Sequence, residues 1–203
     1  MISMRTAAIV LAAGKSERMG RNKLLLKLGQ KTLIDIILDA LEDSKIGEIV
    51  VVLGHKSEEI MDAINHRLSR VKVVVNERYE EGMTSSFKTG LKQTGSVDAT
   101  FLILGDEPIL DWKFLNAMEE EMEKRQDEAS IISPIYKGKK GHPILFHRRL
   151  FEEILGLKDK EVMRDVIHRH IGQLLTVEAP QWTIMDIDTP DDFARMSRFV
   201  KNR

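Results

Sequence analysis

A short loop near the start of the chain combines glycine with basic side chains directly after an apolar run. The run ends at Leu11, Ala12 and Ala13, the loop opens at Gly14, and a second glycine follows at Gly20. Glycine lets backbone N–H groups approach an anion closely, and basic side chains supply the charge that a polyphosphate requires. We therefore expect the loop to bind polyphosphate. Its basic residues are Lys15, Arg18, Arg21 and Lys23.

The spacing within this loop excludes two common nucleotide-binding motifs. A Walker loop has four residues between its glycines and continues with Lys and Ser or Thr, whereas here five residues separate Gly14 from Gly20 and Arg21 follows. The dinucleotide fingerprint Gly-x-Gly-x-x-Gly requires glycine where this chain has Ser16. What remains is a different nucleotide loop or, as the alternative, a tight strand-to-helix turn whose cations are solvated.

Three aspartates elsewhere in the chain are candidates for holding a divalent cation. Asp106 directly follows an apolar run, and Asp186 and Asp188 flank Ile187 in a segment whose alternation places both carboxylates on one face if it is extended. Mg²⁺ binds few protein carboxylates and completes its shell with water and phosphate oxygens. We expect Asp106 and Asp188 to hold Mg²⁺, with Asp186 as a supporting or alternative ligand. A helix cap at Asp188 is the competing interpretation, and the two roles are compatible.

Three segments together resemble a known enzyme family. Residues 11–23 match the signature Leu-Ala-Ala-Gly-x-Ser-x-Arg-Met-Gly-x-x-Lys of nucleotidyltransferases related to the molybdenum cofactor cytidylyl- and guanylyltransferases at every fixed position. Residues 104–108 (Leu-Gly-Asp-x-Pro) and 186–192 (Asp-Ile-Asp-Thr-Pro-x-Asp) resemble metal-binding motifs of the same family. The resemblance extends from residue 7 to about residue 199. It implies a three-layer, Rossmann-like nucleotidyltransferase fold.

Two further segments resemble the cytidylyltransferase branch of that family. Residues 82–86 are similar to its Gly-Met-Ser-Ser-Ser segment, which lies by the nucleobase, and residues 140–143 are similar to its Arg-Gly-His-Pro segment, with lysine for arginine. A structural role is the alternative for His142. Glu107 stands where the branch commonly has glutamine, and this leads us to expect an additional negative charge near the polyphosphate. The resemblance implies nucleotide binding by Leu11, Ala12, Ala13, Gly14, Lys15, Arg18, Lys23, Gly54, Gly82, Ser85 and Asp106, and acceptor binding by His142 and Pro143.

The same resemblance implies a reaction. CMP would pass from CTP to molybdenum-bearing molybdopterin, giving molybdopterin cytosine dinucleotide and pyrophosphate, with Mg²⁺ as cofactor and with Lys23, Arg18 and Asp106 as catalytic residues. Leu-Ala-Ala-Gly rather than Leu-Ala-Gly-Gly in the loop favours cytidine over guanosine. The alternatives are transfer from GTP, transfer to a sugar or alcohol phosphate, and a non-catalytic carrier of nucleotide or cofactor. A molybdoenzyme or a cofactor-insertion chaperone is the expected protein partner.

Composition narrows the class of protein. The chain has 203 residues, 42% of them hydrophobic, and we expect a single domain over residues 1–203. A net charge of -1 argues against binding of nucleic acid or an anionic membrane, and no apolar run reaches the roughly 18 residues of a membrane helix. The absence of cysteine excludes disulfides, thiolate metal sites and a cysteine nucleophile. We expect a cytoplasmic protein that is a monomer or a weak dimer.

Apolar runs alternate with amphipathic segments, and this alternation is typical of a three-layer α/β domain with a mixed, mainly parallel sheet. In such a sheet, ligands bind beyond the carboxyl ends of the strands, where the candidate residues above are expected to meet. The expected strands lie at about residues 6–12, 48–54, 71–76, 99–105 and 129–135, with weaker candidates at 143–147, 174–178 and 183–187. The expected helices lie near residues 32–43, 57–68, 83–94, 111–126, 149–156, 161–171 and 190–201.

Overall fold

The computed structural model describes residues 4–158 and 160–201, and a mixed sheet of eight strands forms the centre of this part of the chain. The strand order is β10-β7-β9-β6-β1-β4-β5, and the short β8 pairs with β7. β1 is parallel to its neighbours β4 and β6, β5 is parallel to β4, and β10 is parallel to β7. β9 runs antiparallel to its neighbours β6 and β7. The predicted mixed, mainly parallel sheet is therefore confirmed. The strands are β1 (Thr6–Ala12), β4 (Glu48–Leu53), β5 (Val71–Val75), β6 (Ala99–Leu104), β7 (Ile131–Tyr136), β8 (Lys139–Lys140), β9 (Ile144–His147) and β10 (Leu174–Glu178).

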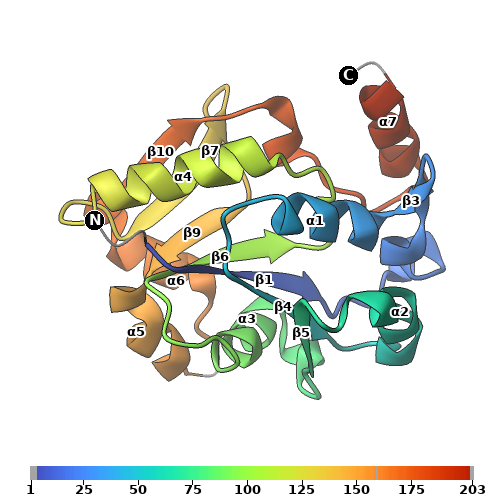
Figure 1. Ribbon diagram of the computed structural model, residues 1–203, viewed down its shortest axis with the longest axis horizontal. Helices are drawn as coiled ribbons and strands as arrows, with labels where there is room; N and C mark the ends of the chain where they lie inside the picture. Colours follow the sequence, from blue (N-terminus) through green and yellow to red (C-terminus); the bar gives the residue numbers. More distant parts are fainter. Residues whose placement is uncertain (1–3, 159, 202–203) are drawn as a thin grey trace.

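Helices cover both faces of this sheet, giving three layers (Figure 1). One face packs against α1, α2 and α4 through side chains such as Ile34, Ile60 and Met118, and the other packs against α3, α5 and α6. Within β1, Val10 belongs to the first cluster and Ile9 to the second, because successive side chains of a strand point to opposite faces. The helices are α1 (Leu33–Glu42), α2 (Ser57–Ile64), α3 (Met83–Leu91), α4 (Trp112–Lys124), α5 (Phe151–Gly156), α6 (Met163–Arg169) and α7 (Pro190–Lys201).

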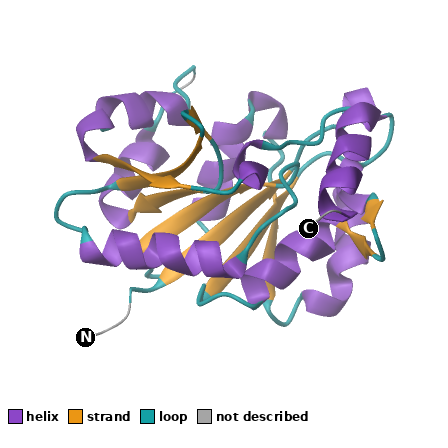
Figure 2. Cartoon of the chain, turned by 90° about the horizontal axis from the view of Figure 1, so that it is seen from above, coloured by secondary structure: helices purple, strands orange, loops and turns teal. Residues whose placement is uncertain are grey.

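A third apolar cluster packs helix α7 against the segment that follows β1. Figure 2 shows this helix, near the end marked C, beside two short strands. Met196 of α7 packs there with Trp182, Ile187 and Leu26, and Leu26 directly precedes a small hairpin of β2 (Lys27–Leu28) and β3 (Lys31–Thr32). Burial of these side chains holds the start of α7 at the carboxyl edge of the sheet. Helix α7 thereby packs against the segment that follows β1.

The prediction of a strand at residues 183–187 is wrong. The chain instead forms a 3-10 turn at Gln181–Ile184 and then crosses the sheet edge in irregular conformation. Its backbone groups bond to two different loops: the carbonyl of Thr183 accepts from His142 N–H at 2.9 Å, and Ile187 N–H donates to the carbonyl of Asp106 at 2.8 Å. The alternating pattern is present, but no neighbouring strand is available for a ladder.

Several helices are shorter than expected because their last turns tighten or break. α2 ends at Ile64 and continues as a 3-10 turn over Asn65–Arg67, and α3 ends at Leu91 rather than near residue 94. Tightening of the last turn satisfies carbonyl groups that an α-helix leaves unpaired. No helix within the described residues has the length and apolar character needed to cross a membrane.

Candidate active site

A cavity of about 690 Å³ opens at the carboxyl end of β1. Its walls come from the loop after β1, the turn before α3, the end of β6 and the segment before α7. This is the edge where a parallel sheet places ligands. Of the residues predicted to bind nucleotide or metal, the cavity brings together Leu11, Ala12, Ala13, Gly14, Lys15, Arg18, Lys23, Gly82, Asp106 and Asp188.

The loop after β1 is shaped by its own short-range contacts. A 3-10 turn at Glu17–Met19 lies between Ser16 and Gly20, whose φ angles of 53° and 66° are both left-handed. The hydroxyl of Ser16 accepts the N–H of Lys23 at 3.2 Å, which closes the loop. A Cβ atom added at Gly14 would meet nothing within 4 Å, so packing against the protein does not explain this glycine. The open space above it is what close approach of a ligand to the backbone requires.

Asp106 owes its position to the glycine before it. The N–H of Gly105 donates to the carbonyl of Leu11 at 3.0 Å, so the ends of β6 and β1 lie side by side. A Cβ atom at Gly105 would lie 2.7 Å from that same carbonyl oxygen, so a larger residue there would push the two strand ends apart. Asp106 therefore emerges next to the loop that contains Gly14.

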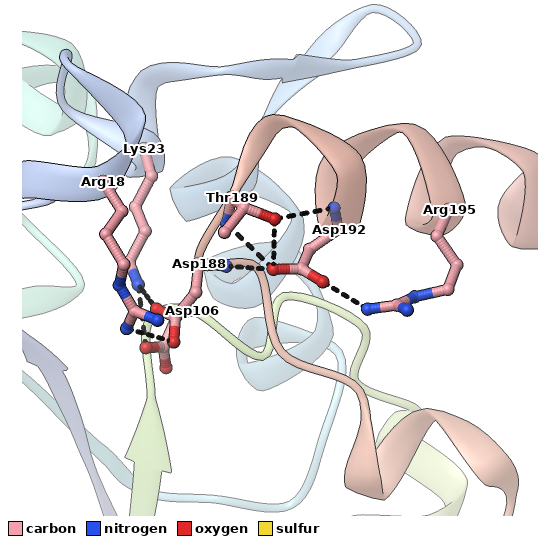
Figure 3. A network of polar contacts seen from close by, with 7 residues as sticks. All are labelled: Arg18, Lys23, Asp106, Asp188, Thr189, Asp192 and Arg195. Atoms are coloured by element: carbon pink, nitrogen blue, oxygen red, sulfur yellow. Dashed lines mark hydrogen bonds and ion pairs between the residues drawn. The ribbon is translucent and has the colours of Figure 1, made fainter.

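Asp188 is positioned by the start of α7. Thr189 caps that helix, since its hydroxyl accepts the N–H of Asp192 at 3.2 Å, and Asp192 in return accepts the N–H groups of Thr189 and Asp188 (Figure 3). The reciprocal bonds form a capping box in which Thr189 is the cap. The carboxylate of Asp188 is thereby left free to face the cavity.

Lys23 lies between the two aspartates that were predicted to hold metal (Figure 3). Its Nζ atom is 2.9 Å from Oδ2 of Asp106 and 2.9 Å from Oδ1 of Asp188, while Arg18 contacts the other oxygen of Asp188 at 2.5 Å. Burial by itself lowers the pKa of Lys23, but the two carboxylates raise it more, so its pKa lies above the ordinary value. Burial likewise raises the pKa of Asp188, and Lys23 and Arg18 outweigh it, so the net shift is downward. Lys23 and Asp188 are thus each held in the charged form at neutral pH by their neighbours.

The donor set in this cluster fits Mg²⁺. Two carboxylates from distant parts of the chain converge on one cationic atom, and carboxylate oxygens are the protein ligands that Mg²⁺ prefers. Within the described residues, no group of three or more His, Asp or Glu side chains is arranged to hold a metal. The protein would therefore supply Asp106 and Asp188, and phosphate and water would supply the remaining oxygens, as is common for Mg²⁺.

An ion pair not anticipated from the sequence connects two walls of the cavity. Nζ of Lys15, from the loop after β1, lies 2.7 Å from Oε1 of Glu80, which belongs to a 3-10 turn at Tyr79–Glu81. Tyr79, Glu80 and Met83 all line the cavity without having been predicted to do so. The available signal was their place beside Gly82, the first residue of the segment that resembles a nucleobase site.

Three residues of the predicted nucleotide-binding loop and segments do not line this cavity. Arg21 is exposed outside it. Gly54 supports its wall from behind, since a Cβ atom there would lie 2.8 Å from the carbonyl oxygen of Ala13. Ser85 faces a different groove and donates its hydroxyl to the carbonyl of Arg78 at 3.1 Å. Nucleotide contacts by Gly54 and Ser85 stay predictions.

The predicted acceptor residues also lie outside the cavity lining. His142 and Pro143 are not among its residues, and the ring of His142 lies against Glu107, with 3.7 Å between Nδ1 and Oε1. Burial lowers the pKa of His142 to about 4. Asp186 is exposed and does not line the cavity either. Acceptor binding by His142 and Pro143 and metal binding by Asp186 stay predictions.

Glu107 does not add the negative charge that its replacement of glutamine led us to expect. Its side chain is largely buried, and burial together with the charges of Asp106 and Asp186 raises its pKa to about 9. The carboxyl group is therefore protonated and neutral at pH 7. In this state its charge equals that of the glutamine side chain that is common at this position in the cytidylyltransferase branch.

The chain matches a known family over most of its length. The family description that matches is the MobA-like NTP transferase domain, over residues 8–174. The molybdenum cofactor cytidylyltransferase of Escherichia coli K12 is 30% identical over 186 residues, which cover 91% of this chain and 92% of the relative. The purine catabolism protein PucB of Bacillus subtilis 168 is also 30% identical, over 94% of this chain and 95% of the relative.

Solved structures agree with these relationships. The crystal structure of Rv0371c from Mycobacterium tuberculosis H37Rv has a TM-score of 0.80 at 25% identity, covering 96% of this chain and 98% of that one. The same mycobacterial protein has been crystallised in complex with manganese, with a TM-score of 0.76. A divalent metal thus binds a protein of this fold. On the match of the family domain and the near full-length relatives, the chain belongs to the MobA-like NTP transferase family.

Proposed function

We propose that this protein transfers CMP from CTP to molybdenum-bearing molybdopterin, giving molybdopterin cytosine dinucleotide and pyrophosphate. The observation that carries the proposal is the convergence of Lys23, Asp106 and Asp188 at one side of the cavity that also contains the glycine loop. Such a site combines cations for phosphate with carboxylates for a divalent ion. The likeness to a cytidylyltransferase over 91% of the chain supports the choice of nucleotide and acceptor.

The transfer needs alignment and charge stabilisation more than proton chemistry. An oxygen of the terminal phosphate of molybdopterin attacks the α-phosphorus of CTP, and a new P–O bond forms. The bond from the α-phosphorus to its bridging oxygen breaks, and pyrophosphate leaves with the electron pair. Because the attacking oxygen is already anionic, no base is required, and the protein must hold both substrates in line and offset negative charge.

Cationic groups of this chain would offset the negative charge of the phosphates. Lys15 and Arg18 come from the loop over which the triphosphate would lie, and the backbone N–H groups near Gly14 are accessible in the cavity. Lys23 lies between the two carboxylates and hence beside any phosphate that reaches them. Asp106 and Asp188 would hold Mg²⁺, which when bound would offset charge on the phosphate oxygens.

The proposed reaction also implies a partner protein, a cellular location and an oligomeric state. The product must reach a molybdoenzyme directly or through a cofactor-insertion chaperone, so we propose one of these as a transient partner. We further propose that the protein acts in the cytoplasm as a single domain, as a monomer or a weak dimer. Gel filtration with light scattering checks the oligomeric state.

Pyrophosphate release tests the proposed reaction. Purified protein is incubated with Mg²⁺, molybdopterin and each of the four nucleoside triphosphates, and both pyrophosphate and dinucleotide product are measured. We expect product from CTP and none in an Asp106→Asn control. Product from GTP alone would overturn the cytidine assignment, and CTP binding without pyrophosphate release would indicate a carrier.

An acceptor panel tests the second half of the proposal. Since a relative named for purine catabolism is as similar as the cytidylyltransferase, molybdopterin must be compared with other acceptors. Sugar phosphates and alcohol phosphates are the required comparisons, because the same cations and carboxylates would serve them. Turnover with one of these, and none with molybdopterin, would replace the acceptor while leaving nucleotidyl transfer in place.

A further inference from the structure

Asn76 is a buried polar residue that connects the sheet to the helix beside the active-site cavity. It directly follows β5, is 4% exposed, and donates its backbone N–H to the carbonyl of Leu53 at 2.8 Å. Its side chain bonds to side chains of α3, the helix that contributes Met83 and Ser86 to the cavity lining. Asn76 is not part of that lining, so any effect it has on a ligand must pass through another residue.

A backbone contact fixes which way the side-chain amide of Asn76 points. The N–H of Arg78 donates to one atom of this amide at 3.1 Å. Because a backbone N–H needs an acceptor, that atom is the oxygen, and the other is the nitrogen with its two hydrogens. This nitrogen, Nδ2, lies 3.1 Å from Oγ of Ser85 and 3.1 Å from Oγ of Ser86. Each serine oxygen therefore accepts one hydrogen from Asn76, and each serine must donate its own hydroxyl hydrogen elsewhere.

The two serine hydroxyls differ in the partner available to their own hydrogens. The hydroxyl of Ser85 donates to the carbonyl of Arg78 at 3.1 Å, so it both accepts and donates within the protein. The hydroxyl of Ser86 has no acceptor among the described residues, although Ser86 is only 3% exposed. A buried donor that stays unpaired is costly. Since Ser86 lines the active-site cavity and Ser85 does not, the hydrogen of Ser86 is available to a ligand there.

We propose that Asn76 is a positioning residue that holds the hydroxyl of Ser86 as a hydrogen-bond donor to a lone pair of the bound nucleoside triphosphate. The inference rests on the proposed function, because it takes a nucleoside triphosphate as the ligand of this cavity. A fixed donor favours a ligand that presents an oxygen or nitrogen lone pair at that place, and it disfavours one that presents a second donor. Asn76 is buried and bonded to the sheet without any ligand, so the donor is preorganised.

Calorimetric titration of the full-length protein with CTP and Mg²⁺ tests the role of Ser86. Ser86→Ala removes the donor and should weaken CTP binding about three- to tenfold, the effect of losing one hydrogen bond to the ligand. Thr89→Ala is the matched control, because Thr89 also lies on α3, donates its hydroxyl to the carbonyl of Ser85 at 3.0 Å and is not part of the cavity lining. This control should bind CTP within about twofold of the wild type. Equal weakening in Ser86→Ala and Thr89→Ala would overturn the proposal.

Asn76→Asp tests the positioning role, because it replaces the NH₂ group by an oxygen at nearly constant size. At slightly alkaline pH the new carboxylate only accepts hydrogen bonds, so the hydroxyl of Ser86 should turn toward it and stop donating to the ligand. We expect CTP binding to weaken at least about threefold, and the same change to cost clearly less in a Ser86→Ala background. Repulsion between the carboxylate and the triphosphate is present in both backgrounds, so the difference isolates the hydroxyl. Equal losses in both backgrounds would overturn the proposal.

Urea unfolding checks that each variant is folded. Should the buried carboxylate of Asn76→Asp prevent folding, Asn76→Ala takes its place in the same pair of backgrounds. The alanine leaves the hydroxyl of Ser86 without its fixed orientation, so it should also weaken CTP binding less when Ser86 is already alanine. Equal losses would again overturn the proposal.

Inorganic tripolyphosphate identifies the part of the nucleotide that accepts from Ser86. A loss of affinity in Ser86→Ala for CTP alone assigns the acceptor to the nucleoside, and an equal loss for CTP and tripolyphosphate assigns it to the phosphate chain; either result supports the proposal. CTP binding that is equal in the wild type and Ser86→Ala would overturn this inference alone. A wild-type protein that binds none of the nucleoside triphosphates would overturn the proposed function together with it.

Discussion

Lys23 and Asp188 are separated by 165 positions in the sequence, yet Nζ of Lys23 lies 2.9 Å from Oδ1 of Asp188. Asp106 completes the cluster at the same distance from Nζ. The contact connects the loop after β1 with the start of α7, so segments far apart in the sequence share one cluster of charged side chains. The side chain of Lys23 is only 12% exposed, and its loss would leave the two carboxylates without their common partner.

Replacing Lys23 by alanine should strongly reduce nucleotidyl transfer. The ammonium group would no longer offset charge on the phosphates, and loss of one such group in a preorganised site costs about 10²–10³ in rate. Pyrophosphate release under saturating substrate measures the effect. Lys27→Ala, an exposed lysine four positions along the chain, is the control and should keep near-normal turnover. Equal turnover in Lys23→Ala and Lys27→Ala would exclude the proposed role.

Asp188→Asn and Asp186→Asn should differ sharply although the residues are two positions apart. Asp188 contacts both Lys23 and Arg18 in the cavity, whereas Asp186 is exposed and outside its lining. We expect Asp188→Asn to weaken Mn²⁺ binding, measured by electron paramagnetic resonance, and to lower turnover by about 10²-fold or more. Asp186→Asn should change each by less than about threefold on the same scale. The reverse ranking would make Asp186 the metal ligand.

Gly141→Ala should destabilise the protein through a direct backbone clash. A Cβ atom at Gly141 would lie 1.9 Å from the carbonyl oxygen of Thr183, in the segment that leads to Asp188. Relief requires backbone movement, with a cost of about 1–3 kcal/mol or more in the free energy of unfolding. Gly156→Ala is the matched control, because its Cβ would meet nothing within 4 Å. Urea unfolding that gives the same midpoint for both variants would contradict this account.

Acid should remove the stabilisation contributed by Asp39. This carboxylate accepts from Lys31 and from Arg67, each at 2.6 Å. Burial raises its pKa, but these two cations lower it more, and the net pKa lies below the ordinary 3.8. A lowered folded-state pKa gives stability that is complete above the unfolded value and is lost as pH falls through the folded value.

The thermal midpoint of Asp39→Asn should therefore lie below that of the wild type at pH 7, and the gap should narrow below about pH 4. Asp127→Asn serves as the control, since Asp127 is exposed and forms no ion pair with another described residue. A gap that stays constant between pH 7 and pH 3 would show that Asp39 contributes by packing rather than by charge.

Much of the fold could be predicted because its elements carry strong local patterns. β1, β4 and β6 are near-continuous apolar runs that are buried on both faces, as parallel strands between helical layers must be. The wrong prediction of a strand at residues 183–187 has a different cause. The segment buries Thr183 and Ile187 at its two ends within an irregular crossing, and no pattern within a segment reveals whether a neighbouring strand is available to pair with it.

Parts of the candidate site were predictable to different degrees. The loop signature and the aspartates after apolar runs located most of the residues around the main cavity, because the ends of parallel strands meet at one edge. The pairing of Lys15 with Glu80 could not be predicted, since each belongs to a different irregular turn. The neutral state of Glu107 could not be predicted either, because it results from burial of the side chain. That burial depends on residues far away in the sequence.

The sequence by itself determined the alternation of strands and helices, the glycine loop with its cations, and the acids that could serve a metal. Those features depend on residue type and short spacing, which local chemistry fixes. Only the tertiary structure decided that Lys23 lies between Asp106 and Asp188 and that Asp186 stays outside. These facts depend on packing between segments far apart in the chain, where burial and close backbone contacts set the distances.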